Sequence, residues 1–114
     1  MDLLTERDYY KPFNYPWAFE FYKKQQQMHW LPDEVPLQDD IKDYNIKLTE
    51  SERTLIDNIF KFFTQADVDV CCGYAKHYLP TFKQPEIRMM LVSYAAMEAV
   101  HQEAYSLLLE TLGK

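Results

Sequence analysis

The stretch PEIRMMLVSYAAMEAVHQEAYSLLLETLG, residues 85–113, decides the fold of this chain. Its apolar side chains recur at steps of three and four residues, which is the period of one face of an α-helix. Pro85 fits the first turn of such a helix, where the missing N–H of proline costs no hydrogen bond. Gly113 fits its end, because glycine readily adopts the left-handed conformation that stops a helix. We therefore predict a helix over residues 85–112.

Polar side chains lie on the apolar face of this helix. Glu98, His101 and Tyr105 follow one another at steps of three and four residues, in line with Leu91 and Leu108. A buried carboxylate without a partner is costly, so a compensating group is expected beside it. Glu-x-x-His is the spacing that di-metal sites in helix bundles use, because carboxylates balance the cations and a neutral imidazole supplies nitrogen. The pattern therefore indicates a metal site.

A second long helix is predicted over residues 49–77. Thr49 and Glu52 form a capping box at its start, and Leu79-Pro80 requires it to end, because the residue before proline disfavours the helical conformation. Asn14 is expected to cap a shorter helix over residues 16–30. Residues 1–13 are expected to form an irregular leader and residues 31–47 a surface connection. Since no strand-like alternation appears, the predicted class is all-α.

Asp67 adds a second carboxylate to an apolar helix face. It falls four residues after Phe63 and seven after Phe60, and side chains at these steps share one face of a helix. A lone Glu-x-x-His often arises by chance. With Asp67 on the apolar face of the preceding helix, a metal site and an ordinary core become equally good interpretations of these residues. We expect Asp67 to converge with Glu98 and His101 on one interior point.

Other reactive side chains receive ordinary interpretations. His77 is expected at a helix end on the surface, His29 in an interface, and Asp69 in solvent together with the acidic side chains of residues 39–43. The vicinal pair Cys71-Cys72 is interpreted as two thiols along a buried or half-buried helix, with a redox role as the alternative.

Charge and composition exclude two classes of partner. The chain has 18 acidic and 12 basic residues, for a net charge of −6, and no basic cluster beyond Lys23-Lys24. A surface that binds a nucleic-acid polymer needs clustered Lys and Arg, so we expect none. The sequence contains no apolar run of about 18 residues and begins with an acidic segment, so we expect no membrane span, no signal peptide and a cytoplasmic location.

Three separated segments occur in a recognisable order. They read WLPDEV at residues 30–35, FTQAD at residues 63–67 and MEAVHQEAYS at residues 97–106, and Asp67 precedes Glu98 by 31 residues. These segments resemble the Trp-x-Pro-Glu-Glu-Val segment, the first aspartate ligand and the Glu-x-x-His-x-x-x-Tyr signature of one family. It is the small, radical-generating subunit of class I ribonucleotide reductases, and the aromatic-rich helices look closest to its bacterial or phage iron-dependent members.

The resemblance implies a ferritin-like helical bundle with a di-metal centre of iron, or alternatively of manganese. Asp67, Glu98 and His101 would bind metal, Tyr105 would carry a stable radical, and Trp30 would pass electrons between the protein surface and the centre. The small subunit would form a homodimer. It would act with a large catalytic subunit in the reduction of ribonucleotides to deoxyribonucleotides.

The resemblance also implies that part of the site lies elsewhere. The family uses six ligands, four carboxylates and two histidines, whereas this chain supplies three of them and has no second Glu-x-x-His. We interpret residues 1–114 as a single incomplete domain, inactive until the remainder of the small subunit or a complementary fragment completes it. A truncated product, one part of a split gene and an excerpt of a longer protein all fit. Two other interpretations stay open: another ferritin-like di-iron oxidase, and a non-catalytic helical fragment.

Several apolar side chains would then lack their partners. We expect the isolated chain to be partly unfolded or self-associating, because it would expose a set of large side chains, namely Phe60, Phe63, Leu91, Tyr94, Leu108 and Leu112.

Overall fold

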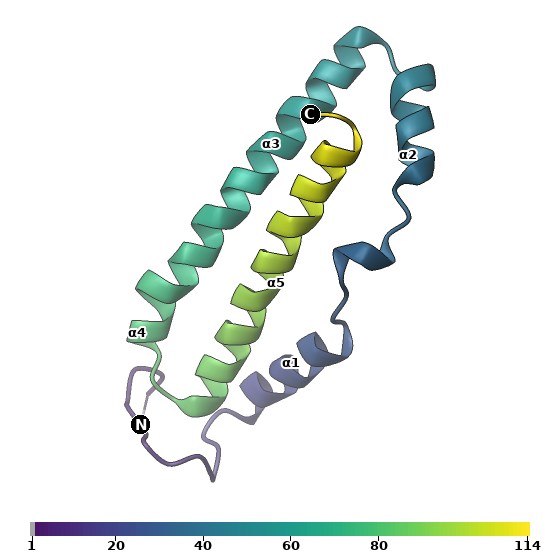
Figure 1. Ribbon diagram of the computed structural model, residues 1–114. Coiled ribbons are helices and arrows are strands. Elements are labelled where there is room, and N and C mark those ends of the chain that lie inside the picture. The colour runs from purple at the N-terminus through teal and green to yellow at the C-terminus, as the bar shows by residue number, and fades with distance from the viewer. Residues whose placement is uncertain (1) are drawn as a thin grey trace. The chain divides into compact units, whose positions relative to one another are not determined.

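The structure is a computed structural model that describes residues 2–114. No strand occurs among these residues, which confirms the all-α class. Figure 1 shows two long helices, α3 and α5, joined by a short connection. The elements in chain order are α1 (Pro16–Gln27), η1 (Pro32–Glu34), α2 (Gln38–Lys42), η2 (Asp43–Lys47), α3 (Glu50–Gly73), η3 (Tyr74–Tyr78), α4 (Leu79–Thr81) and α5 (Pro85–Thr111).

The termini of the long helices follow from local chemistry. The backbone N–H of Thr49 donates to Glu52 Oε2 at 2.7 Å, and the N–H of Glu52 donates to Thr49 Oγ1 at 3.2 Å, which confirms the capping box. Gly113 has a φ of 80°, the left-handed conformation expected after the last helix.

The predicted cap at the start of α1 is wrong. Tyr15 occupies the cap position and makes no side-chain cap hydrogen bond. Asn14 instead donates through its backbone N–H to Glu86 Oε2 at 2.8 Å and through Nδ2 to Gln84 Oε1 at 2.9 Å. Two acceptors at or just before the start of α5, 72 and 70 residues away in sequence, therefore replace the local cap.

The second helical run does not end before Leu79-Pro80, as we expected. The wider π-helical turn η3 follows α3, and α4 then continues the run to Thr81. Proline is tolerated in the first turn of a helix. The wider hydrogen-bonding pattern of the π-helical turn accommodates the N–H group that Pro80 lacks. The backbone leaves the helical conformation at Phe82, with φ −102° and ψ 107°.

The expected surface connection contains short helical elements that the sequence pattern did not predict. They are η1, α2 and η2, and Asp39, Asp40 and Asp43 within them are exposed, as expected for solvated charge. Tyr44 of η2 is only 5% exposed, and its hydroxyl donates to Asp57 Oδ1 of α3 at 2.8 Å.

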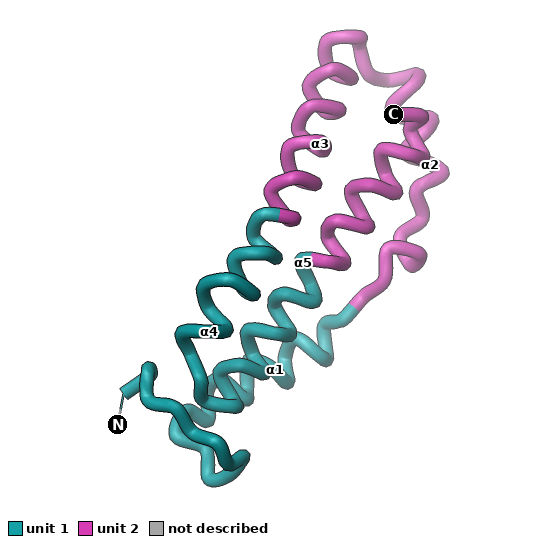
Figure 2. The backbone as a smooth tube through the Cα atoms, turned by 60° about the vertical axis from the view of Figure 1, so that its left-hand side comes forward, with its two compact units in different colours: residues 1–29, 69–98 teal, residues 30–68, 99–114 magenta. Residues whose placement is uncertain are grey.

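The described chain divides into two compact units, which Figure 2 colours separately. Unit 1 contains Met1–His29 and Asp69–Glu98, and unit 2 contains Trp30–Val68 and Ala99–Lys114. Each unit therefore takes one stretch of α3 and one stretch of α5. The interpretation of the chain as one incomplete domain stays a prediction.

The core of unit 1 joins α1 to the first half of α5. Ala18, Ile87 and Leu91 form its buried cluster, with Tyr15, Tyr74 and Leu79 among the side chains packed against it. The expected exposure of Leu91 is wrong, since this side chain is 9% exposed within the cluster. Of the other side chains expected to be exposed, Phe63 is 40% exposed, and four are half-buried, namely Phe60, Tyr94, Leu108 and Leu112.

A buried ion pair ties the N-terminal residues to the start of α5 within unit 1. Arg7 Nη2 lies 2.7 Å from Glu86 Oε1, and both side chains are almost fully buried, at 1% and 0% exposure. Glu86 Oε2 also accepts hydrogen bonds from Arg7 Nη1 at 3.0 Å and from the backbone N–H of Asn14 and Tyr15. Gln84 Oε1 accepts a further hydrogen bond from Arg7 Nη1 at 2.8 Å.

Among the described residues, no helix combines the length and the apolar composition that crossing a membrane requires.

Candidate metal centre

Asp67 and His101 come together within unit 2. Asp67 lies in α3 and His101 in α5, which run side by side in both views (Figures 1 and 2), and both side chains are half-buried. An oxygen of Asp67 and an imidazole nitrogen of His101 lie within 4.8 Å of each other. Two atoms that bind one metal ion at about 2.0–2.2 Å each are at most about 4.4 Å apart. The two groups are therefore spaced much like ligands of a shared cation.

Glu98 lies one helical turn before His101. The helix α5 runs unbroken through this point, although Glu98 is the last residue of unit 1 and His101 belongs to unit 2. Glu98 and His101 are three residues apart in the sequence, so helical geometry assigns both to one face of α5. Burial raises the pKa of the Tyr74 phenol in unit 1, and the negative charge of Glu98 raises that pKa further.

The carboxylate of Asp67 has an unsatisfied oxygen. Asp67 Oδ2 is buried and has no hydrogen-bond partner within residues 2–114. The nearby Gln102 Nε2 donates to the backbone oxygen of Asp67 at 3.4 Å and not to its carboxylate. A buried polar atom left without a partner is costly and calls for an explanation such as a bound ion. Carboxylate oxygens with an imidazole nitrogen suit iron and similar divalent metals, so the residues present fit part of a metal centre.

Tyr105 lies one turn beyond His101 and packs against two aromatic rings of α3. Its ring centroid is 5.9 Å from that of Phe60, in a stacked arrangement, and 5.5 Å from that of Phe63. The Tyr105 side chain is half-buried. These rings shield one side of the phenol from water.

Trp30 packs against one of the candidate ligands. Its ring centroid lies 6.3 Å from that of His101, with an interplanar angle of 33°. The turn η1 follows directly, with Glu34 N–H donating to Leu31 O at 3.0 Å and Leu31 N–H donating to Glu34 Oε2 at 3.3 Å. This local hydrogen bonding fixes the backbone next to Trp30.

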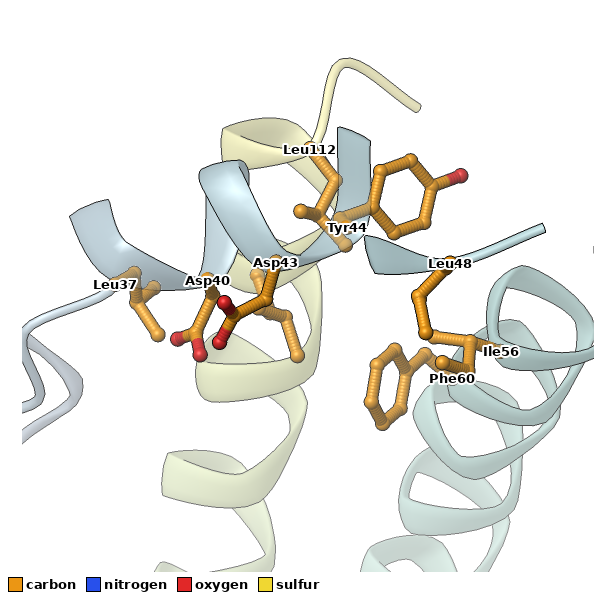
Figure 3. A pocket seen from close by; sticks show the side chains of 9 residues that line it. Leu37, Asp40, Asp43, Tyr44, Leu48, Ile56, Phe60 and Leu112 are labelled. Atoms are coloured by element: carbon orange, nitrogen blue, oxygen red, sulfur yellow. The ribbon is translucent and has the colours of Figure 1, made fainter. Parts of the chain in front are cut away.

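Two apolar pockets lie in unit 2 near these residues. The larger, of about 340 Å³, is shown in Figure 3, where Phe60 and Ile56 of α3 face the side chains of Leu37, Asp40 and Asp43. The smaller is an open pocket of about 150 Å³. It is lined by Trp30, Pro32, Val35, Leu37, Ala104, Tyr105, Leu107 and Leu108. The two pockets share Leu37 and Leu108.

Some neighbours of the site were not predicted. Phe60 and Phe63 of α3, whose rings pack against Tyr105, were not predicted as its neighbours. Their place on the same helix face as Asp67 was the available signal. Gln102, which joins α5 to the backbone of α3, carried no signal in the sequence.

The other histidine and cysteine side chains do not belong to the candidate ligand group. His29 and His77 are exposed, as is Cys72. Cys71 is half-buried, as expected, and its thiol lies 3.7 Å from the Ala95 carbonyl oxygen. The expected burial is wrong for Cys72, which is exposed.

Comparison with known proteins identifies relatives of this chain. A family model described as "Ribonucleotide reductase, small chain" matches residues 7–114. The probable ribonucleoside-diphosphate reductase small subunit of Invertebrate iridescent virus 6 is 51% identical over 113 residues, covering 99% of this chain and 31% of the relative. The ribonucleoside-diphosphate reductase small subunit of Dictyostelium discoideum is 36% identical over 100 residues, covering 88% of this chain and 30% of the relative. The chain thus spans about a third of the length of these relatives.

A solved structure supports the fold. The ribonucleotide reductase Rnr4 homodimer from Saccharomyces cerevisiae superposes with a TM-score of 0.86 at 23% identity, covering 97% of this chain and 36% of that chain. At this identity the likeness shows the fold alone, a ferritin-like arrangement of helices. The relatives named here are viral and eukaryotic, so they lend no support to the expected likeness to bacterial or phage members.

Proposed function

Because this chain belongs to the ribonucleotide reductase small-chain family, we propose that it forms the N-terminal part of a radical-generating small subunit of ribonucleoside-diphosphate reductase. The complete subunit would hold a tyrosyl radical for the reduction of ribonucleotides to deoxyribonucleotides. The single observation that carries this proposal is the buried Asp67 Oδ2, which lacks a hydrogen-bond partner in the described chain and lies beside the imidazole of His101.

The proposed metal ligands of this chain are Asp67, Glu98 and His101. They offer two carboxylates and one neutral imidazole, and the further carboxylates and histidine of a di-metal site would come from outside the chain. We propose iron as the metal, with manganese as the alternative. When bound, the di-metal centre supplies the reduction of dioxygen and a one-electron oxidant.

Tyr105 would lose one electron and its phenolic proton to become the stored radical. Its position one turn after His101 supports this role, and so does its packing against Phe60 and Phe63, because rings exclude the water and reductants that quench a radical. Trp30 would relay an electron between the protein surface and the centre. The contact of its ring with the His101 ring supports that assignment.

The proposed partners follow from the same reading. The remainder of the small subunit, or a complementary fragment, would complete the site. A second small subunit would form a homodimer, and a large catalytic subunit would receive the oxidising equivalent. We propose a cytoplasmic location for this assembly and no role in binding nucleic-acid polymers or membranes.

A chimera provides the test. This chain replaces the matching residues of the 51% identical viral relative, so that the rest of that protein supplies the missing ligands. After anaerobic Fe(II) loading and exposure to air, the chimera should contain a di-iron centre and show a tyrosyl radical by electron paramagnetic resonance. The 114-residue chain alone should show neither. A chimera that folds but binds no iron would refute the proposal.

A different ferritin-like di-iron oxidase is the second candidate. It would use the same Glu-x-x-His but has no need of Tyr105 beside the site or of Trp30 against His101. If the chimera bound iron and consumed dioxygen but showed no tyrosyl radical, this second candidate would be favoured.

A further inference from the structure

Three tyrosine rings in unit 1 form a continuous series that ends at the surface. The ring centroids of Tyr94 and Tyr74 are 6.5 Å apart, and those of Tyr74 and Tyr78 are 5.6 Å apart. Both separations are those of contacting aromatic pairs. Tyr94 and Tyr74 are half-buried, whereas Tyr78 is 49% exposed. The series therefore joins the interior of unit 1 to solvent through ring contacts alone.

The inner end of the series lies beside a proposed metal ligand. Tyr94 precedes Glu98 by four residues, so helical geometry assigns both to one face of α5. Burial is the largest cause of the raised pKa of the Tyr74 phenol, and the negative charge of Glu98 is the next. The Glu98 carboxylate is thus within electrostatic reach of that phenol. Both inner tyrosines therefore belong to the part of unit 1 that carries Glu98.

The outer end of the series is built by the π-helical turn η3. Tyr74 and Tyr78 are its first and last residues, and single π-helical turns occur frequently at functional sites. Lys76 and His77 lie between them in the sequence, and both side chains are exposed. Lysine is positively charged at neutral pH, so the surface next to Tyr78 favours the approach of an anion.

We propose that Tyr78, Tyr74 and Tyr94 form an electron path from a small anionic reductant in solution, of the ascorbate class, to the metal centre at Glu98. A phenol can give one electron to a strong oxidant, which is also the chemistry proposed for Tyr105. The acceptor rests on the proposed function, whereas the path itself rests only on the tyrosine series. The path is separate from Trp30, which contacts His101 in unit 2.

The electrons and protons of this path balance. The inner tyrosines give one electron to the oxidant that the proposed function supplies and receive one from Tyr78. A proton that leaves either inner phenol returns to it, so both end unchanged. Tyr78 loses one electron, and its phenolic proton passes to solvent. Ascorbate then returns one electron to Tyr78 and solvent returns the proton, which leaves ascorbate as its one-electron-oxidised radical.

Light-driven oxidation tests the path without any metal. A ruthenium photo-oxidant is attached to Ala99→Cys, at an exposed position next to Glu98 on α5, in the metal-free chimera with its own cysteines replaced by serine. A flash in the presence of a cobalt(III) electron acceptor converts the ruthenium complex into a one-electron oxidant. A nitroso spin trap then marks the tyrosine on which the radical ends, and mass spectrometry locates the adduct. We expect the adduct at Tyr78.

Phenylalanine variants interrupt the path while keeping the packing of the rings. Tyr74→Phe should remove most of the adduct at Tyr78, because the middle ring can no longer be oxidised. Tyr94→Phe should cause the same loss, which gives a second, independent break. Tyr22→Phe is the matched control, at a half-buried tyrosine of α1 in the same unit, and should leave the adduct unchanged. No adduct at Tyr78, or an adduct that survives both interruptions, overturns the proposal.

The iron-loaded chimera tests the acceptor. Unbound Fe(II) is removed, and the chimera is exposed to air in the presence of ascorbate. We expect an ascorbate radical signal by electron paramagnetic resonance, which Tyr74→Phe should lower and Tyr22→Phe should not, with equal iron content in both variants. An equal signal in Tyr74→Phe would overturn the supply of electrons to the centre. The light-driven adduct at Tyr78 in a chimera that takes up no iron would instead show that the proposed function has failed and the tyrosine path has not.

Discussion

Replacing Glu86 by Gln should release the N-terminal residues from α5. The substitution keeps the shape of the side chain but removes its charge. It also replaces one accepting oxygen by an NH₂ group, which cannot accept the hydrogen bonds that the surrounding groups donate. Glu86 now accepts hydrogen bonds from Arg7 Nη2 at 2.7 Å and from the backbone N–H groups of Asn14 and Tyr15 at 2.8 and 3.0 Å. Both partners of the ion pair are at most 1% exposed, so solvent cannot compensate the guanidinium.

The expected cost is that of a buried pair that loses one member, about 3–5 kcal/mol. Hydrogen–deuterium exchange of the Asn14 and Tyr15 amides in the chimera measures it locally, because these N–H groups donate to the carboxylate itself. A loss of about 3 kcal/mol corresponds to a fall of roughly 100-fold in their protection. The exposed pair Asp43–Lys47 supplies the matched control, and Asp43→Asn should leave both amides unchanged. A fall of less than about tenfold in Glu86→Gln would refute the reasoning.

The pH dependence of the same amides has a defined sign. Burial raises the pKa of Glu86, but hydrogen bonds from Arg7 and from the Tyr15 backbone outweigh it, so the net pKa lies below the ordinary value of 4.5. A carboxylate with a lowered folded-state pKa stabilises fully above its unfolded-state pKa. Protection of the two amides, corrected for intrinsic exchange, should therefore be constant above about pH 5 and fall as the pH drops through the folded-state pKa. Protection that rises on acidification contradicts this assignment.

Three further outcomes are expected. Asp67→Asn should lower the Fe(II) affinity of the chimera by at least about 100-fold in a calorimetric titration, since loss of even an outer-sphere partner costs 10–100-fold; an unchanged affinity would remove Asp67 from the site. Tyr105→Phe should abolish the radical signal with the iron content intact, and a surviving signal would assign the radical elsewhere. The isolated chain should elute as oligomers or melt without cooperativity, because exposed side chains such as Phe62 and Leu55 each forgo roughly 1.5–3 kcal/mol of burial against a usual total stability of about 5–15 kcal/mol; a sharp melt from a monomer would contradict this.

The helices were predictable because their signals are local. The Thr49–Glu52 capping box, Pro85 and Gly113 act through hydrogen bonds and backbone angles within a few residues of themselves. The same period that predicted α5 also aligned Glu98, His101 and Tyr105, so their common face followed from one helix alone.

The features that were missed depend on contacts between distant parts of the chain. Asn14 has a typical capping side chain, yet Glu86 and Gln84 draw it away from α1. Leu91 is buried against Ala18 of α1. The periodic pattern within α5 does not predict which element covers this side chain. Pro80 was expected to end its helix, but the π-helical turn η3, which ends at Tyr78, accommodates it.

The Asp67 carboxylate differs from that of Glu86 in how its oxygens are satisfied. Glu86, fully buried, has its oxygens satisfied by Arg7 and two backbone N–H groups, so its network stabilises the fold by itself. Asp67 has no such arrangement, because its buried Oδ2 lacks a donor within the described residues. A fold that served only its own stability would supply a donor there or replace the carboxylate by an apolar side chain. Within the described residues this oxygen is unsatisfied, so a cation that bound there in the folded state alone would stabilise that state by mass action.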